Sequence, residues 1–241
     1  MKGVEMTNRR VLFLTFLALF AGVCARTAAA QNPALQQKVA ELKQAAAQNK
    51  QMLAQYTWQE QATISLKGEQ KKQENFQVRL GPDGKPQKQS LGPQEQQQQQ
   101  SGRRGRLKEH VVEKKTEEYQ DYANQIKALI QQYVPPEQGL IQQAQQQGNI
   151  ALTNSNPGQY TLTISNYVKP GDNMTLVLDA AQKNLVSVSI NTYLTDPKDA
   201  VTVSVQFAQM PGGPNHISTE TINGVSKQLT IAIQNSNYQH L

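Results

Sequence analysis

The sequence predicts an α+β protein in which amphipathic helices cover the apolar concave face of one large curved antiparallel sheet, a half-barrel of about eight or nine strands. Apolar residues recur at three- or four-residue steps in two long segments, which indicates helices. In most other segments every second residue is apolar, which indicates strands with one apolar and one polar face. The connections between these strands are short and turn-rich, so consecutive strands should pair as a meander whose apolar side the helices cover.

The first thirty residues have the layout of a secretory signal peptide. A basic start, MKGVEMTNRR, precedes the apolar run VLFLTFLALFAGVCA, which is shorter than the ~20 residues of a membrane-spanning helix. Ala28 and Ala30 fit a cleavage site after Ala30, and cleavage after Ala25 is the alternative. A valine precedes Cys24 where a lipid-anchored protein has a small residue, so no lipid anchor is expected. The mature chain, residues 31–241, is predicted to be a single periplasmic or secreted domain.

Charge and cysteine content narrow the classes of function. The full sequence holds 24 basic and 18 acidic residues, a formal net charge of +6. Four of these basic residues and one acidic residue lie in the signal peptide, which leaves 20 against 17, or +3. A nucleic-acid partner is not expected, because it requires a concentrated basic face. The one cysteine, Cys24, lies in the segment predicted to be removed, so the mature chain has no thiol chemistry.

Three helices are predicted. Asn32 and Pro33 are typical of a helix start, and the apolar stripe that follows predicts a helix of about 22 residues. A second stripe predicts a helix over residues 107–133, which the two prolines that follow should end. A shorter helix is expected over residues 137–147.

The strands form two groups on either side of the helices. The first group consists of an alternating segment from Tyr56 to Gly68, a second around NFQVRL, and a weak third after the turn signal GPDGK. The second group fills most of the last ninety residues with six strands, at about residues 159–168, 173–180, 184–194, 200–208, 215–222 and 228–238. The residues that alternate with the apolar ones are mainly Thr, Ser, Gln and Asn.

The segment at residues 92–106, GPQEQQQQQSGRRGR, contains no apolar residue. It is predicted to be a disordered loop, because it cannot bury enough surface to offset the entropy of ordering it. The remaining glutamines mostly occupy the polar faces of periodic segments.

No pattern of residues indicates an enzyme, a cofactor or a metal site. The three histidines, His110, His216 and His240, have no ligand-like spacing, and we expect them at the surface. The glycine-rich segment MPGGPN lies between two predicted antiparallel strands and has no helix start that would bind an anion, so it is interpreted as a turn. The prediction is a non-enzymatic protein without a cofactor.

The order of segments and the turn chemistry resemble the LolA/LolB-like family of periplasmic lipoprotein carriers. The resemblance rests on the signal peptide, on a helix that ends in MLAQYTWQEQATISLKG, and on LVLDAAQKNLVSVSI, which looks like the family's strand, Asp-led turn and strand. It implies a curved antiparallel sheet lidded by helices, with an apolar cavity that takes acyl chains. Family members hold the lid closed through an arginine on an early strand. Arg79 is on such a strand, but its alternation with Phe76 and Val78 points it outward.

An apolar cavity needs no catalytic group to bind an acyl chain, because each CH₂ group removed from water contributes ~0.8 kcal/mol. The sequence therefore predicts an exported envelope protein that binds or carries lipid or lipoprotein acyl chains between sheet and helices. The alternative is a non-catalytic structural or protein-interaction module of the cell envelope with a filled core. The expected partners are a lipid or an acylated protein, or an envelope protein in the alternative, with only transient membrane contact.

The predicted cavity lining consists of apolar residues that share the inward parity of their strands. Trp58, the one tryptophan, is expected at the mouth or in the floor of the cavity. The complete set is Tyr56, Trp58, Ile64, Leu66, Phe76, Val78, Leu162, Ile164, Leu176, Leu178, Val188, Ile190, Val203, Val205, Phe207, Ile231 and Ile233.

Overall fold

The computed structural model describes residues 44–92, 106–134 and 136–241 of the chain. The predicted signal peptide with its cleavage site lies outside these residues, as do the first part of the first predicted helix and nearly all of the predicted loop at 92–106.

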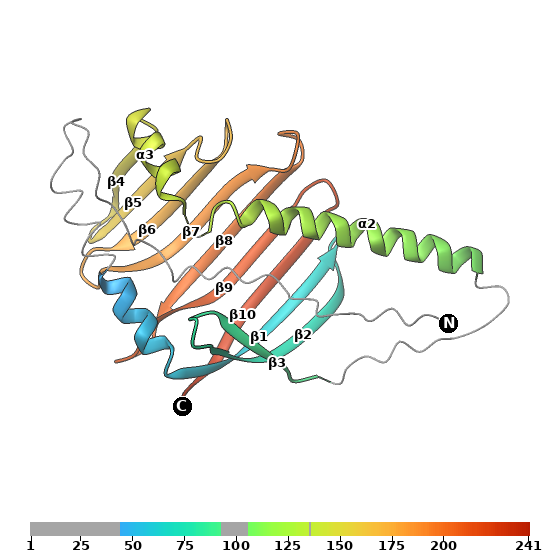
Figure 1. Cartoon of the computed structure of the whole chain (residues 1–241), viewed down its shortest axis with the longest axis horizontal. Coiled ribbons are helices and arrows are strands. Elements are labelled where there is room, and N and C mark those ends of the chain that lie inside the picture. The colour runs from blue at the N-terminus through green and yellow to red at the C-terminus, as the bar shows by residue number, and fades with distance from the viewer. Residues whose placement is uncertain (1–43, 93–105, 135) are drawn as a thin grey trace.

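Ten antiparallel strands form one curved, open sheet (Figure 1). The strands are β1 (Tyr56–Leu66), β2 (Glu69–Leu80), β3 (Pro86–Ser90), β4 (Ile150–Asn156), β5 (Gln159–Ser165), β6 (Asn173–Asp179), β7 (Asn184–Tyr193), β8 (Ala200–Gln209), β9 (Asn215–Gly224) and β10 (Leu229–His240). Their order across the sheet is β3-β2-β1-β10-β9-β8-β7-β6-β5-β4. The fold class predicted from the sequence is thereby confirmed.

The sheet has one strand more than the upper number expected. The additional strand, β4, lies at the edge of the sheet and pairs only with β5 among the described strands. Its sequence, IALTNSN, holds two large apolar residues, Ile150 and Leu152, so the alternation is too short to stand out.

Strand β2 begins earlier than the sequence indicated. Lys67 and Gly68 both have positive φ, 54° and 80°, as in a two-residue type I′ hairpin turn. This turn joins β1 directly to β2, so the polar stretch from Glu69 to Asn75 continues the ladder although it has no apolar residues.

Three helical segments lie on one side of the sheet (Figure 1). Residues 44–53 are helical and lead into β1, and α2 (Arg106–Ile130) and α3 (Gln138–Gln146) connect β3 to β4. Helix α2 stops three residues before the predicted end at Tyr133. Its last turn tightens to i→i−3 hydrogen bonds at Gln132 and Tyr133, because the residue before a proline is disfavoured in the α conformation.

The two ends of the described chain meet in the middle of the sheet. Strand β1 pairs with β2 on one side and with the last strand, β10, on the other, and Ile64 lies opposite Ile231 in the β1–β10 pair. The N-terminal and C-terminal groups of strands therefore form one continuous surface.

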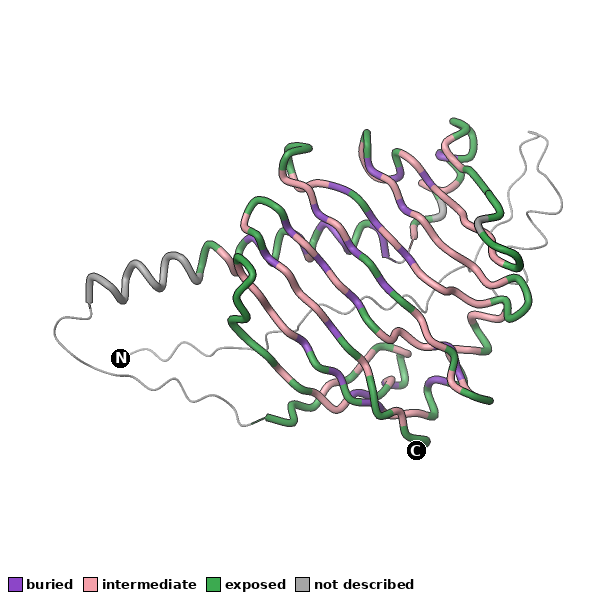
Figure 2. The backbone as a smooth tube through the Cα atoms, turned by 180° about the vertical axis from the view of Figure 1, so that it is seen from behind, coloured by how far each residue is buried: buried purple, intermediate pink, exposed green. Residues whose placement is uncertain are grey.

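Figure 2 views the sheet from behind, on the side away from the helices, with residues coloured by burial. Cross-strand partners on this face are hydroxyl residues, as in the row of Thr163, Thr175, Ser189, Ser204 and Thr221. The buried core therefore lies entirely on the concave side, where α2 crosses the strands.

Candidate functional site

Cross-strand pairing arranges the predicted lining residues in rows on the concave face. Direct partners in antiparallel strands point to the same side of a sheet. One row consists of Ile164, Met174, Ile190, Val203, Ile222, Ile231 and Ile64. A second row consists of Leu162, Leu176, Val188, Val205, Glu220, Ile233 and Ala62. Residues that alternation in the sequence assigns to the inward face are therefore neighbours in the sheet, although some of their strands are far apart in the chain.

The seventeen predicted residues divide by burial, and none of them is fully exposed. The eight buried ones are Trp58, Val78, Ile164, Val188, Ile190, Val203, Val205 and Ile233. The nine that keep partial exposure are Tyr56, Ile64, Leu66, Phe76, Leu162, Leu176, Leu178, Phe207 and Ile231. Their role as a ligand surface stays a prediction.

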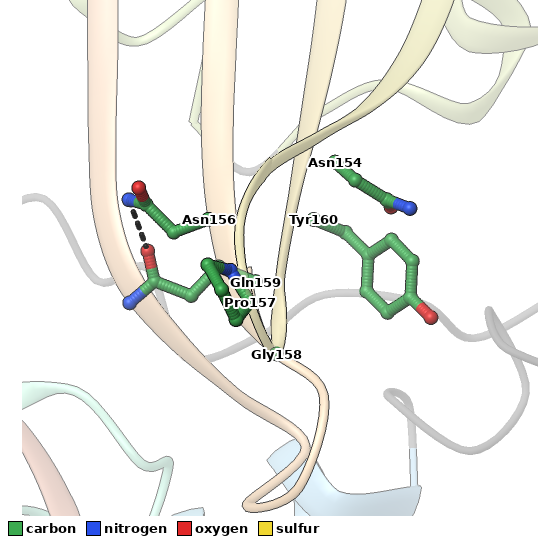
Figure 3. Close-up of a pocket in the computed structure, with 6 residues that line it drawn as sticks. All are labelled: Asn154, Asn156, Pro157, Gly158, Gln159 and Tyr160. Carbon is green, nitrogen blue, oxygen red and sulfur yellow. Dashed lines mark hydrogen bonds between the residues drawn. The ribbon is translucent and has the colours of Figure 1, made fainter.

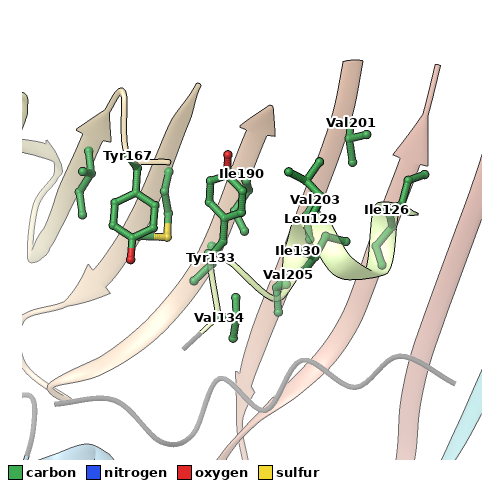
Figure 4. Packing of buried hydrophobic residues seen from close by; sticks show 14 of the residues in the cluster. Ile126, Leu129, Ile130, Tyr133, Val134, Tyr167, Ile190, Val201, Val203 and Val205 are labelled. Carbon is green, nitrogen blue, oxygen red and sulfur yellow. The ribbon is translucent and has the colours of Figure 1, made fainter. Parts of the chain in front are cut away.

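The C-terminal half of α2 packs on the middle of this face (Figure 4). Its contribution to the buried cluster consists of Tyr122, Ile126, Leu129 and Ile130, followed by Tyr133 and Val134 just after the helix. The helix therefore acts as a cover over strands β7, β8 and β9.

Close approach of α2 to the sheet depends on Gly224, the last residue of β9. A Cβ atom at this position would lie 2.6 Å from Ile126 Cδ1 and 2.6 Å from Tyr122 Cε1. Real Cβ atoms essentially never come within 3.0 Å of such neighbours. The absence of a side chain here lets the helix rest on the strand.

A buried hydrogen-bond network anchors the end of α2. The Tyr133 hydroxyl donates to Asp172 Oδ2 at 2.5 Å and lies 2.7 Å from Thr192 Oγ1. The Asp172 carboxylate also accepts from three successive backbone N–H groups at residues 167–169. Burial and the bond to Asp172 raise the pKa of Tyr133, so the tyrosine stays neutral and keeps donating.

Trp58 marks the other end of the concave face. It is 6% exposed and packs with Leu53, from the helix at residues 44–53, and with Val78 of β2. The Tyr238 ring stacks on the indole with a centroid distance of 5.5 Å and an interplanar angle of 16°. The His216 ring lies 4.1 Å from the Tyr238 ring. Trp58 therefore joins the first helix to the sheet.

A buried ion pair lies beside these aromatic rings. Glu60 follows Trp58 on the same face of β1, is 1% exposed, and pairs through Oε1 with Lys88 Nζ of β3. The Lys88 ammonium also lies 4.8 Å above the centroid of the Phe76 ring. Burial raises the pKa of Glu60, which the Lys88 charge partly opposes, and burial lowers the pKa of Lys88 to about 8.

A second carboxyl group, Glu220 of β9, lies in the apolar row between its partners Val205 and Ile233. It is 4% exposed. Burial raises the pKa of Glu220 to about 8, the charge of Glu60 adds to this, and the charge of Lys88 opposes it. At neutral pH Glu220 therefore holds its proton, while Glu60 pairs directly with Lys88.

The sequence pattern did not lead us to predict these buried polar groups, and it led us to place His216 wrongly. Glu60, Glu220 and Asn235 occupy inward positions of strands that are otherwise apolar there, and that parity was the available signal. His216 was expected at the surface, but it is half-buried and its Nδ1 atom is buried. Burial also lowers the pKa of His216, which favours the neutral ring. We call Glu60, Lys88, His216, Glu220 and Asn235 the polar cluster.

A separate hollow of about 310 Å³ lies at the turn between β4 and β5 (Figure 3). It is lined by Asn154, Asn156, Pro157, Gly158, Gln159 and Tyr160. None of these residues belongs to the predicted lining, and the hollow opens at a hairpin rather than between sheet and helices.

The described residues contain no group of three or more His, Cys, Asp or Glu side chains placed to hold a metal ion. In the same part of the chain, no helix is both long and apolar enough to cross a membrane.

Comparison with known proteins gives only weak likenesses. No family model matches the chain, and no curated protein matches it. The solved structures that it resembles include a DUF1329 family protein from Desulfovibrio piger, at 8% identity and a TM-score of 0.37, over 84% of this chain and 92% of that one. A LolA superfamily protein from Nitrosomonas europaea matches at 8% identity and a TM-score of 0.36, over 86% and 93%. Likenesses of this degree say nothing about what the chain binds.

Proposed function

We propose that this chain is an exported envelope protein of the LolA-like type that binds the acyl chain of a lipid or lipoprotein on the concave face of its sheet. It acts as a binding or carrier protein rather than as an enzyme. The ligand lies between the sheet and the helices that cover it, and the membrane is contacted only when the ligand is exchanged.

One observation carries this proposal: the helices leave a band of apolar side chains on the concave face partly exposed. The band, which we call the apolar strip, consists of Leu162, Leu176, Leu178, Leu185, Phe207 and Ile217. Five of these side chains pack against the buried core, so the strip is a continuation of it rather than a set of scattered surface residues.

The strip suits an acyl chain because its attraction is apolar and needs no specific partner. Each CH₂ group removed from water contributes ~0.8 kcal/mol, so a long chain gains several kcal/mol even after the cost of immobilising it. Helix α2 rests on the sheet through side-chain packing and is anchored at its C-terminal end by Tyr133 and Asp172. A ligand can therefore displace packed side chains while the anchor keeps the cover attached.

The proposal is tested by uptake of a fluorescent fatty acid by the full mature chain and two variants of β6. Leu176→Gln places an amide in the strip, whereas Thr175→Gln places the same group one residue away on the polar face. We expect the first change to weaken uptake about tenfold and the second to leave it unchanged, because only the first puts a polar group against the chain. Equal uptake by both variants, or none by the unmodified protein, would favour the alternative of an interaction module with a filled core.

A further inference from the structure

We infer that the polar cluster is a recognition site for an ammonium group, carried by a ligand whose apolar part lies on the adjoining apolar strip. The cluster joins β1, β3, β9 and β10 at one end of the concave face. The inference rests on the proposed function, which accounts for the apolar chain of the ligand. It adds the chemistry of the head group of that ligand.

The first observation is a set of buried polar atoms without hydrogen-bond partners. Among the described residues these side-chain atoms are Glu60 Oε2, His216 Nδ1, Glu220 Oε1 and Asn235 Oδ1. Nearly all buried polar atoms in folded proteins are hydrogen-bonded, so four in one region call for an explanation. Glu60 and Glu220 are 1% and 4% exposed, which leaves their free oxygens little contact with solvent.

These atoms come from neighbouring positions of the sheet. Asn235 is the direct partner of Glu60, and it lies two residues beyond Ile233, the direct partner of Glu220. In an antiparallel pair such diagonal positions are about 7–8 Å apart, within reach of long side chains. His216 lies on the same strand as Glu220 and contacts the Tyr238 ring. The unpartnered oxygens of Glu60, Asn235 and Glu220 therefore come from neighbouring positions of three adjacent strands.

Their chemistry selects a hydrogen-bond donor. An ionised carboxylate, an amide oxygen and an unprotonated ring nitrogen all accept hydrogen bonds. An ammonium group offers three donors in a compact tetrahedral arrangement and has no acceptor of its own. A carboxylate or phosphate would instead place a further acidic group beside Glu60, which is unfavourable.

The charges in the cluster favour a cation over a neutral hydroxyl. Among the described residues, the carboxyl groups of Glu60, Glu220 and Glu74 act on the charge of Lys88, and Lys88 pairs directly with Glu60. Glu220 makes no ion pair with any residue that the structure describes, and burial raises its pKa to about 8. When an ammonium group binds beside Glu220, the carboxyl group releases its proton to solvent as one H⁺. The resulting carboxylate then pairs with the ammonium group. The titratable groups whose charges act on Glu220 are Glu60 and Lys88.

The cluster also adjoins the strip that would hold the rest of the ligand. The Asn235 Nδ2 atom donates to the backbone oxygen of Ile217 at 3.0 Å, and Ile217 is the direct partner of Phe207. From these two residues the strip continues to Leu185 and Leu178, which are partners on β7 and β6. An amphiphile with its head at the cluster can therefore lay its chain across successive strands.

The test uses three probes with the same ten-carbon chain: decylamine, decanol and decanoate. Binding to the full mature chain at pH 7 is followed by calorimetry and by Trp58 emission. We expect decylamine to bind about tenfold or more tightly than decanol, and decanoate to bind most weakly, because the amine alone forms charge-assisted bonds to the carboxylates. Calorimetry in buffers of different ionisation enthalpy should show proton release with decylamine only.

The variant Glu220→Gln replaces the carboxyl group with a neutral group of the same shape. It should abolish the preference for decylamine and the proton release, while decanol binds as before. Glu69→Gln, at an exposed position of β2, is the matched control and should change neither.

Equal binding of decylamine and decanol by the unmodified protein would overturn the inference and leave the proposed function standing. If decanol binds most tightly, the cluster recognises a hydroxyl group and not an ammonium group, which contradicts the inference. A preference for decylamine that survives in Glu220→Gln would also contradict it. If none of the three probes binds, the inference and the proposed function both fail.

Discussion

At the scale of single residues, the structure places carboxyl groups where the sequence pattern demands apolar side chains. Glu60 and Glu220 are almost fully buried on the concave face, and each leaves one carboxyl oxygen without a hydrogen bond among the described residues. A buried unpaired polar atom costs roughly 1–3 kcal/mol of stability. Retaining two such groups in one region suggests that they serve binding rather than folding.

The shifted pKa values predict how stability changes with pH. The pKa of Glu220 rises from 4.5 in the unfolded chain to about 8 in the folded protein, and that of Glu60 is raised as well. The folded state therefore holds protons that the unfolded state releases. The contribution of these bound protons to the free energy of unfolding is full below pH 4.5 and is lost as the pH rises through 8. The pKa of Lys88 is lowered to about 8, so Lys88 has the opposite effect. It increases the free energy of unfolding as the pH rises, but only above that pH.

Urea unfolding at pH 5.5 and pH 8 should accordingly give a lower free energy of unfolding at pH 8. The Glu220→Gln variant should lose most of this difference, because its side chain has no proton to release. The control Glu69→Gln should keep it. A pH dependence that is the same in the unmodified protein and in Glu220→Gln would show that Glu220 is already ionised in the folded state.

At the scale of elements, alternation and turn chemistry predicted most strands well, because one face of each strand is buried and the other is polar. Strand β8, predicted at residues 200–208, spans Ala200–Gln209. Two features of the strands were not predicted, each for a local reason. Strand β4 has too few apolar residues to show alternation, and the early start of β2 is set by the Lys67–Gly68 turn. The end of α2 is set by the proline after Val134.

The contact between α2 and β9 gives a prediction at this scale. Gly224→Ala adds a Cβ atom 2.6 Å from Ile126 Cδ1 and 2.6 Å from Tyr122 Cε1, so these side chains of α2 must shift. We expect a loss of about 1–3 kcal/mol in the free energy of unfolding, as for other overpacked cores. Gly92→Ala is the control, since its Cβ would meet nothing within 4 Å.

The measurement is chemical denaturation of both variants, together with fatty acid uptake. Because the change does not alter the apolar strip, Gly224→Ala should still take up the probe. If the variant is as stable as Gly92→Ala, α2 does not rest on β9 as described.

At the scale of the whole molecule, the pairing of β1 with β10 creates the features that the sequence did not reveal. This pairing joins residues at the two ends of the described chain, such as Glu60 and Asn235, which are 175 positions apart. Alternation shows which side of a strand is apolar, but not which strands become neighbours across the sheet. The rows of the concave face were therefore predictable residue by residue, whereas the polar cluster, built from β1, β3, β9 and β10, was not.

The curved open sheet, polar on one face and apolar on the other, is the basis of the proposed function. Of the seventeen residues predicted to line a ligand surface, eight are buried and nine keep partial exposure. A filled interaction module would have the same strands and the same helices. The two accounts therefore differ in whether the protein carries a bound ligand, rather than in how it folds.

Native mass spectrometry of the mature protein purified from its own envelope tests the central claim most directly. The account predicts a population with added mass equal to one lipid or acyl chain, which is lost on denaturation and regained on incubation with fatty acid. Recovery of ligand-free protein alone, with no fatty acid bound after incubation, would contradict it.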